Sequence, residues 1–269
     1  MSELCFNTMN RSAYLLGDED PDLPGQIRAA SRAGFGLIGP DAFSIRAFCA
    51  GGGRVEELDE AIRSAGLRCF ELPTLAIGAD RDANREMLRE LFEIAKVLRP
   101  DFVQLNVDSK VDTVVVDGLR RAGDLFGAEG MGLAIEYLPW LPEIRNIQST
   151  RAFLERADVP CAGVLVDSWH FFLSDDSWED LDALPLDELS YLQFDDHPPL
   201  ESDDLVAETL GRRVMPGEGH FELTRFCDAL RAKGFDGVVS CEILSDATRR
   251  MDLDQFAAQV YSSSRRFWP

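Results

Sequence analysis

The stretch Gly132-Leu-Ala-Ile-Glu136 is a short apolar run that closes on a carboxylate, and the same design returns along the chain. Cys161-Ala-Gly-Val-Leu-Val-Asp167 and Val238-Val-Ser-Cys-Glu242 close in the same way, and Asp195 follows Leu192-Gln-Phe194. A carboxylate at the tip of a buried strand costs desolvation free energy unless a cation or strong donors meet it. If these strands form one barrel, their tips converge, and the sequence predicts a site for a hard divalent cation.

Strand-like and helix-like segments alternate on both sides of these runs. The strands are short and apolar, which is typical of a parallel sheet buried on both faces, and the helices show a 3.6-residue apolar period. The expected strands are Leu4–Thr8, Phe35–Ile38, Leu67–Leu72, Phe102–Asn106, Gly132–Glu136, Val164–Asp167, Leu189–Phe194 and Val238–Glu242. The expected helices are Leu23–Ala33, Val55–Ala65, Asn84–Leu98, Val111–Phe126, Thr150–Ala157, Trp178–Leu184, Phe221–Lys233 and Leu253–Arg266.

Eight strand-then-helix units in 269 residues favour a single (β/α)8 TIM barrel that takes up the whole chain, residues 1–269, over an open sheet. Ser149 is a candidate N-cap of the helix that begins at Thr150. The acidic segment Pro198–Arg213 has no strong pattern, and we expect it to be a long loop, or a lid, after the seventh strand.

Composition excludes several classes of function. Lys and Arg total 27 against 48 Asp and Glu, a net charge of −21, which disfavours nucleic acid and anionic membranes as partners. No apolar run approaches the ~18 residues of a membrane span, and the N-terminus has no signal-peptide pattern, so we expect a cytoplasmic protein. The six cysteines form no CxxC pair and are expected to be reduced. No GxGxxG, P-loop or GxSxG motif is present.

The strand ends supply the candidate site residues. Glu136 and Glu242 are either surface carboxylates or a pair of metal ligands that also move a proton at carbon. Asp167 and His170, three residues apart, can face one pocket, and the imidazole could hydrogen-bond a substrate oxygen. His197 is either a metal ligand or an exposed loop residue.

Five blocks in the second half of the chain resemble the sugar phosphate isomerase/epimerase family, which has the xylose-isomerase-like barrel. They are Ala134-Ile-Glu-Tyr-Leu-Pro-Trp140, Gly163-Val-Leu-Val-Asp-Ser-Trp-His170, Leu192-Gln-Phe-Asp-Asp196, Arg213-Val-Met-Pro-Gly-Glu-Gly219 and Gly237-Val-Val-Ser-Cys-Glu242. The family includes ketose 3-epimerases, hydroxypyruvate isomerase, inosose dehydratase and 3-dehydroshikimate dehydratase. The first half of this chain matches only in its strand–helix rhythm.

The resemblance implies one divalent metal ion. Glu136, Asp167 and Glu242 fall on three of the family's four ligands, and Gln193 stands where the family usually has a His, with His197 as an alternative fourth ligand. An all-oxygen set favours Mn²⁺, Mg²⁺ or Co²⁺ over Zn²⁺, and Mn²⁺ is our first expectation.

The resemblance also implies substrate contacts. His170 falls on a substrate-contacting His, and Arg213 falls on an Arg that would hold a carboxylate, phosphate or hydroxyl group. Glu71, at the expected end of the third strand, is a further candidate for substrate binding.

The resulting expectation is a metal-dependent isomerase or epimerase that acts on a sugar or sugar-like keto compound. Glu136 or Glu242 would take the proton next to a carbonyl, giving an enediolate held by the metal, and the opposite glutamate would return it. The alternative is a dehydratase of the 3-dehydroshikimate or inosose type, which shares the first step and expels a β-hydroxyl. Gln193, in place of the family's usual His, slightly favours this lyase.

Two further classes remain less favoured. A phosphodiesterase like endonuclease IV needs three metals and many histidines, whereas this chain has three histidines and a charge of −21. A non-catalytic binding module is disfavoured because the chain has four well-placed candidate metal ligands. The expected partner is therefore a small polyol or keto acid, and the sequence leaves open whether the protein is a homo-oligomer.

Overall fold

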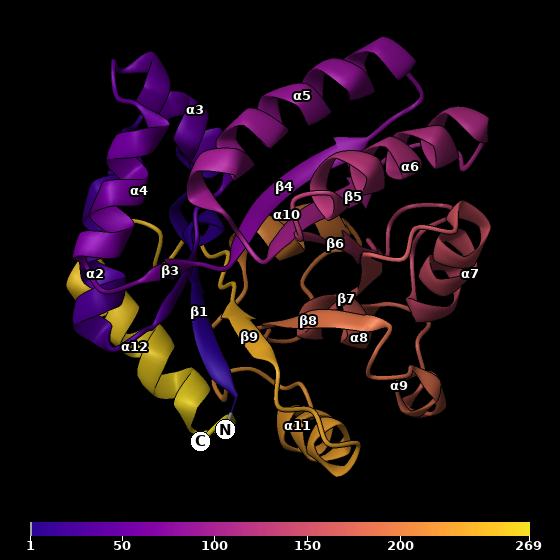
Figure 1. Cartoon of the computed structure of the whole chain (residues 1–269). Helices are drawn as coiled ribbons and strands as arrows, with labels where there is room; N and C mark the ends of the chain where they lie inside the picture. The colour runs from indigo at the N-terminus through magenta and orange to yellow at the C-terminus, as the bar shows by residue number, and fades with distance from the viewer. Residues whose placement is uncertain (1) are drawn as a thin grey trace.

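Parallel strands and helices alternate from end to end in the computed structural model, which describes residues 2–269 (Figure 1). The strands are β1 (Glu3–Asn7), β2 (Leu37–Gly39), β3 (Arg68–Cys69), β4 (Glu71–Ile77), β5 (Phe102–Val107), β6 (Gly132–Glu136), β7 (Ala162–Asp167), β8 (Leu189–Phe194) and β9 (Val238–Cys241). The longer helices are α2 (Leu23–Ala33), α3 (Ala42–Ala50), α4 (Val55–Ser64), α5 (Arg81–Leu98), α6 (Thr113–Gly127), α7 (Ile147–Ala157), α11 (Leu223–Ala232) and α12 (Leu253–Arg265). The short ones are η1 (Thr8–Arg11), α1 (Ala13–Leu16), α8 (Ser168–Leu173), α9 (Trp178–Ala183) and α10 (Leu205–Gly211).

The strands form one nearly closed (β/α)8 barrel, which confirms the predicted fold. Their order is β3-β2-β1-β9-β8-β7-β6-β5-β4, and every pairing is parallel. The first and last strands of that order, β3 and β4, are separated only by Phe70. Its N–H donates to Ile38 O at 2.9 Å, and its carbonyl accepts from Phe102 N at 3.0 Å. Phe70 therefore continues the backbone hydrogen bonding between the β2–β3 end and the β4–β5 end of the sheet, where the barrel closes.

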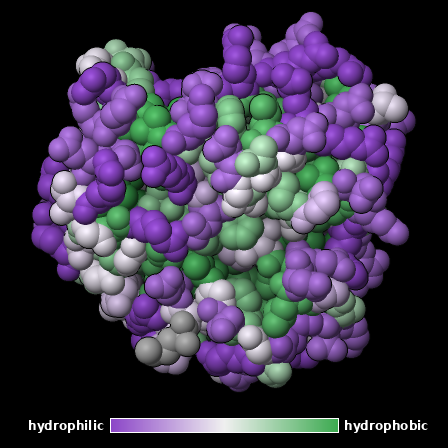
Figure 2. Space-filling view, in the orientation of Figure 1, coloured by the Kyte–Doolittle hydropathy of each residue, from purple (hydrophilic) through white to green (hydrophobic). Residues whose placement is uncertain are grey.

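Two apolar cores hold the barrel. The inner one fills the barrel with Cys5, Leu37, Phe70, Leu165 and Tyr191 among others, and the outer one lies between strands and helices. Because both faces of each strand are covered, the strands read as apolar runs. The helices present polar side chains outward, and in Figure 2 hydrophilic residues cover most of the rim while hydrophobic ones gather near the centre. No helix among residues 2–269 is long and apolar enough to cross a membrane.

The third strand was placed wrongly by the sequence. We expected it to run from Leu67 to Leu72 and to end there. Instead β4 continues to Ile77, with a register irregularity between Leu72 and Leu75 that accommodates Pro73. Glu71 therefore opens β4 rather than closing a strand, and its side chain lies lower in the barrel than the strand tips.

Other expectations differ at element ends. The helix predicted from Thr150 begins at Ile147, because Asn146 is the N-cap. The Asn146 side chain accepts from Ser149 N, and the Ser149 side chain accepts from Asn146 N, which forms a capping box. The segment Pro198–Arg213, expected to be a loop, contains α10, which Asp204 caps. Helix α8 was not predicted, and it forms directly after β7 because Asp167 caps it.

Candidate active site

The four residues that the sequence predicted as metal ligands meet at one end of the barrel. Glu136 ends β6, Asp167 ends β7 opposite Gln193 of β8, and Glu242 directly follows β9. None is more than 5% exposed. Parallel strands end at the same rim of a barrel, which explains how residues up to 106 positions apart come together.

Glu136 is held by two amides of the neighbouring strand. Gln104 Nε2 and Asn106 Nδ2, both on β5, donate to its Oε2 at 2.7 and 2.8 Å. Its Oε1 lies 3.3 Å from His170 Nδ1. Burial, with a contribution from the charge of Asp167, raises the pKa of Glu136 to about 7, so this carboxyl can exchange a proton near neutral pH. Sequence reasoning missed Gln104, although it shares a strand face with the strand-end Asn106.

Asp167 and His170 join Glu136 in a compact donor cluster. One donor atom from each residue lies within 4.8 Å of the others. Burial favours the neutral form of Asp167, but the charge of Arg213 and the hydrogen bonds from Arg213 and from Trp169 N outweigh it and lower the pKa of Asp167. Burial lowers the pKa of His170 to about 4, so its imidazole is neutral at neutral pH. A carboxylate beside a neutral imidazole is a donor set that divalent metals accept.

Glu242 closes the other side of the site. Its Oε1 accepts from Asn7 Nδ2 at 3.1 Å and from Gln193 Nε2 at 3.2 Å. Burial, reinforced by the neighbouring carboxylates and opposed by Arg213, raises the pKa of Glu242 well above its usual range. Asn7 ends β1, and the sequence analysis did not single it out even though it is a strand-end polar residue.

Arg213 lies among these carboxylates rather than at the edge of the site. Its Nη1 is 2.8 Å from Asp167 Oδ2 and 3.3 Å from Glu242 Oε2, and it also bonds the Asp195 carboxylate. The side chain is only 1% exposed. The nearby carboxylates overcome the effect of burial and raise the pKa of Arg213 further, so it remains a cation.

Two candidates lie apart from this group. Glu71 is fully buried inside the barrel, where Ser240 donates to its Oε1 and Cys5 Sγ is 3.6 Å away. His197 is also buried, with Nδ1 2.6 Å from Pro198 O and Nε2 3.5 Å from Glu208. Neither residue lines the pocket described next, so the structure gives no direct contact between them and a molecule bound there.

A pocket of about 280 Å³ opens above the carboxylates. Its deep part is polar, with Glu136, His170, Arg213 and Glu242, and α10 contributes Thr209 to the same wall. Its outer part is apolar. The lining there consists of Met9, Tyr14, Phe43, Leu75, Leu138, Trp140, Leu210 and Leu244. The pocket thus combines a charged floor with walls suited to the apolar edge of a small ring.

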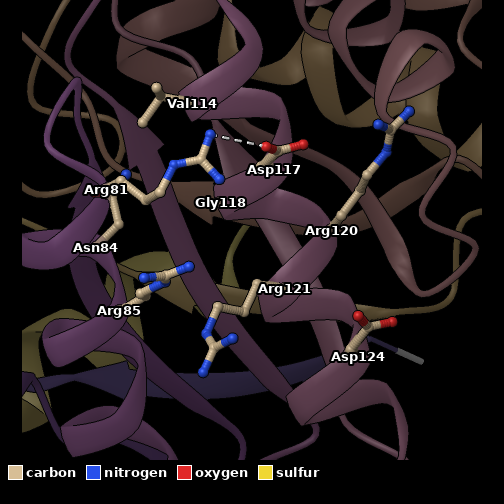
Figure 3. A pocket seen from close by; sticks show the side chains of 9 residues that line it. All are labelled: Arg81, Asn84, Arg85, Val114, Asp117, Gly118, Arg120, Arg121 and Asp124. Atoms are coloured by element: carbon tan, nitrogen blue, oxygen red, sulfur yellow. Dashed lines mark ion pairs between the residues drawn. The ribbon is translucent and has the colours of Figure 1, made fainter.

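A second hollow lies outside the barrel, between α5 and α6, and Figure 3 shows its lining. Arg81, Arg85, Arg120 and Arg121 surround it with Asp117 and Asp124, and Arg81 pairs with Asp117 at 3.1 Å. It contains none of the residues predicted for chemistry. The barrel mouth is therefore the candidate active site.

The chemistry of the donors fits a divalent metal ion. Gln193 Oε1 and His170 Nε2 are buried and have no hydrogen-bond partner among residues 2–269. Leaving such atoms unpaired costs free energy, so both are suited to a ligand. His170 belongs to the compact cluster with Glu136 and Asp167, whereas Glu242 and Gln193 could add oxygens from the other side of the site to complete a coordination shell.

Comparisons with known proteins agree with this architecture. A 3-dehydroshikimate dehydratase of Pseudomonas putida is 27% identical over 180 residues, which are 65% of this chain and 28% of that protein. The chain thus spans less than a third of that relative. An inosose isomerase of Halalkalibacterium halodurans is 22% identical over 204 residues, covering 70% of this chain and 71% of that protein. A solved structure of IolI protein with a bound zinc atom superimposes with a TM-score of 0.84 at 18% identity, covering 98% of this chain and 97% of the other.

The family itself follows from a match over most of the chain. The model described as "Xylose isomerase-like TIM barrel" matches residues 27–267, which include every strand from β2 to β9 and the candidate residues Glu136, Asp167, His170, Gln193, Arg213 and Glu242. The chain belongs to the xylose isomerase-like TIM barrel family.

Proposed function

We propose that this protein is a divalent-metal-dependent lyase that removes water from a small hydroxylated cyclic keto acid. One observation carries the reaction class: Glu136 and Glu242 are two buried carboxyls with raised pKa values that line the same pocket. Removing a proton from the carbon beside a carbonyl needs a base whose pKa is close to the working pH. Two such groups allow one to take a proton and the other to give one.

The donors described above would hold a divalent metal ion beside the substrate. Glu136, Asp167 and Glu242 would hold it, with Gln193 or His170 completing the set, and Mn²⁺ is the ion we propose first. When bound, it supplies a positive charge that polarises the substrate carbonyl. Gln104 and Asn106 keep Glu136 oriented, Asn7 and Gln193 do the same for Glu242, and the neutral His170 can donate a hydrogen bond to a substrate oxygen.

Dehydration completes the reaction with balanced atoms. One glutamate removes the α-proton, the electron pair forms a carbon–carbon double bond, and the β-hydroxyl leaves as water with a proton from the other glutamate. The apolar outer wall favours a cyclic substrate, because an open-chain polyol would leave hydroxyl groups against leucines. The match to a 3-dehydroshikimate dehydratase supports the same choice.

An isomerase or epimerase is the second candidate. The inosose isomerase relative favours it, because this chain covers 71% of that protein against 28% of the dehydratase. The first step would be the same proton removal, and reprotonation at the neighbouring or the same carbon would replace the loss of water.

Incubation in D₂O with Mn²⁺ tests both candidates. We would supply 3-dehydroshikimate and an inosose separately and follow the products by mass spectrometry and NMR. Loss of 18 mass units supports the lyase, whereas an isomer carrying one deuterium supports the isomerase. Glu242→Gln should stop both, while the exposed Glu218→Gln serves as a charge-matched control with normal activity. Absence of deuterium uptake and of product with either substrate would contradict the proposal for these substrates.

A further inference from the structure

One guanidinium nitrogen contacts the same oxygens that a metal ion would need. Arg213 Nη1 lies 2.8 Å from Asp167 Oδ2 and 3.3 Å from Glu242 Oε2. The residue is only 1% exposed, so solvent does not screen these contacts. Asp167 and Glu242 are two of the three carboxylates in the proposed ligand set. Their lone pairs cannot serve a guanidinium and a metal ion in the same positions at the same time.

The rest of Arg213 is anchored elsewhere. Nε and Nη2 donate to Thr209 Oγ1 on α10 at 3.1 and 2.8 Å. Nη1 also bonds Asp195, which directly follows β8 and in turn accepts a hydrogen bond from Ser168 at 3.3 Å. These partners, and the main-chain oxygen of Glu242 that accepts from Nη1 at 3.2 Å, leave the carboxylate oxygens of the proposed ligands unused. The guanidinium could therefore leave Asp167 and Glu242 by a small movement and keep its hold on Asp195 and Thr209.

Electrostatics gives the exchange its driving force. Buried carboxylates need a counter-ion, and removing one partner from a buried pair leaves an uncompensated charge. A guanidinium in contact with Asp167 and Glu242 meets this need, and a divalent ion meets it more fully. Two cations held by the same oxygens would repel each other at short range in a site with little water to screen them.

We propose that Arg213 is an exchangeable counter-ion of this site: it neutralises Asp167 and Glu242 until a divalent metal ion displaces it, and it then remains on Asp195 and Thr209 at the pocket wall. This inference rests on the metal-dependent function proposed above. Under this proposal Arg213 competes with the metal ion for Asp167 and Glu242. Metal binding therefore also determines the position of the Arg213 guanidinium in the pocket.

Mn²⁺ binding by the full chain, after treatment with a chelator, tests the exchange without a substrate. Arg213→Met should bind Mn²⁺ about tenfold more tightly than wild type, within the roughly 5–150-fold range typical of coupled sites. Arg212→Met is the matched control, because it removes the same charge one residue away while its guanidinium pairs with Glu201 and Glu208. We expect the control to stay within about threefold of wild type.

Ionic strength separates contact from distant repulsion. Displacement at contact should persist at 0.5 M salt, whereas simple repulsion between separated charges should fade as the Debye length shrinks to a few ångströms. If Arg213→Met does not fold, Arg213→Lys replaces it. A lysine keeps the charge but lacks the fork that spans several acceptors, so it should bind Mn²⁺ more tightly than wild type by a smaller factor.

The Mn²⁺ affinities of wild type and variants test the exchange separately from the metal-dependent function. Equal or weaker Mn²⁺ binding by the Arg213 variants, with normal binding by wild type, would overturn the exchange and leave the metal-dependent function standing. A gain in affinity that vanishes at 0.5 M salt would also overturn it. Failure of wild type and all variants to bind Mn²⁺ would overturn the exchange and the proposed metal site together.

Discussion

Buried carboxyl groups lie at two depths inside this barrel, and within residues 2–269 the upper ones line the pocket at the barrel mouth whereas Glu71, below them, does not. Glu71 in the lower layer has Ser240 and Cys5 as neighbours, and burial raises its pKa. Glu136 and Glu242 in the upper layer also have raised pKa values, but they line a cavity and lie beside Arg213 or His170. A raised pKa therefore does not identify a reactive carboxyl by itself. Access and a nearby site for a cation make the difference.

The sharpest test of this comparison replaces one glutamate in each layer by glutamine. Glu242→Gln should lower the rate of α-proton exchange by about 10²–10⁴-fold, the usual contribution of a positioned acid or base. Glu71→Gln should leave that rate within about threefold, because the side chain has no contact with the pocket. Deuterium uptake measured at equal protein and Mn²⁺ concentrations gives both values. Equal losses in the two variants would remove the distinction between the layers.

Support for Glu136 should matter almost as much as its charge. Gln104→Leu removes the 2.7 Å bond to Oε2 of Glu136 and also the acceptor, Gln104 Oε1, of one hydrogen bond from Gln193 Nε2. Loss of a group that orients a metal ligand typically costs 10–100-fold in metal affinity, and we expect about tenfold weaker Mn²⁺ binding. Titration calorimetry measures this change, with Gln148→Leu on the surface of α7 as a control. Unchanged affinity would show that Gln104 does not position Glu136.

The apolar wall should affect substrate binding more than chemistry. Trp140 lines the pocket and its ring packs edge-on to His170 with centroids 5.6 Å apart. Trp140→Ala should raise KM about tenfold, since losing aromatic contact with a ligand costs on the order of 1–2 kcal/mol. Steady-state kinetics checks this once a substrate is known. Trp178→Ala, outside the pocket, should leave KM unchanged, and a similar rise there would point to general loosening of the barrel.

The smallest expected effect concerns stability and its dependence on pH. Because burial raises the pKa of Glu71, the folded protein holds that proton more tightly than the unfolded chain does. The stabilisation is complete below the ordinary pKa of glutamate and is lost as the pH rises through the raised value.

Glu71→Gln should therefore be more stable than wild type at neutral pH, by a rise of roughly 2–4 °C in melting temperature if the gain is about 1 kcal/mol. The difference should shrink toward pH 4. Thermal melts of both proteins between pH 4 and 8 check this, and a variant that is less stable at neutral pH would show that Glu71 works as an ion.

The sequence predicted the strands whose apolar runs end in a polar residue, because burial on both faces leaves that pattern in the residues themselves. Those runs placed Glu136, Asp167 and Glu242 at the barrel mouth. The prediction was wrong at Glu71, which opens β4 and does not end a strand, because a register irregularity between Leu72 and Leu75 lets β4 continue past Pro73 to Ile77.

Arg213 could not be positioned from sequence. Its location depends on the path of residues 195–213, where α10 carries Thr209 toward the barrel, and no periodic pattern records that path. Contacts across the barrel, such as the 3.3 Å hydrogen bond from Gln193 to Gln104, could not be predicted either. They depend on the combined registers of four strands, and no single strand sequence determines them.

Anomalous diffraction from a crystal of wild-type protein soaked in Mn²⁺ would locate the metal ion and Arg213 in one measurement. We expect one strong peak between Glu136, Asp167 and Glu242, with the guanidinium of Arg213 withdrawn from Asp167 and still bonded to Asp195. A peak elsewhere, or an Arg213 that keeps its contacts with Asp167 and Glu242 while no ion binds among them, would contradict it.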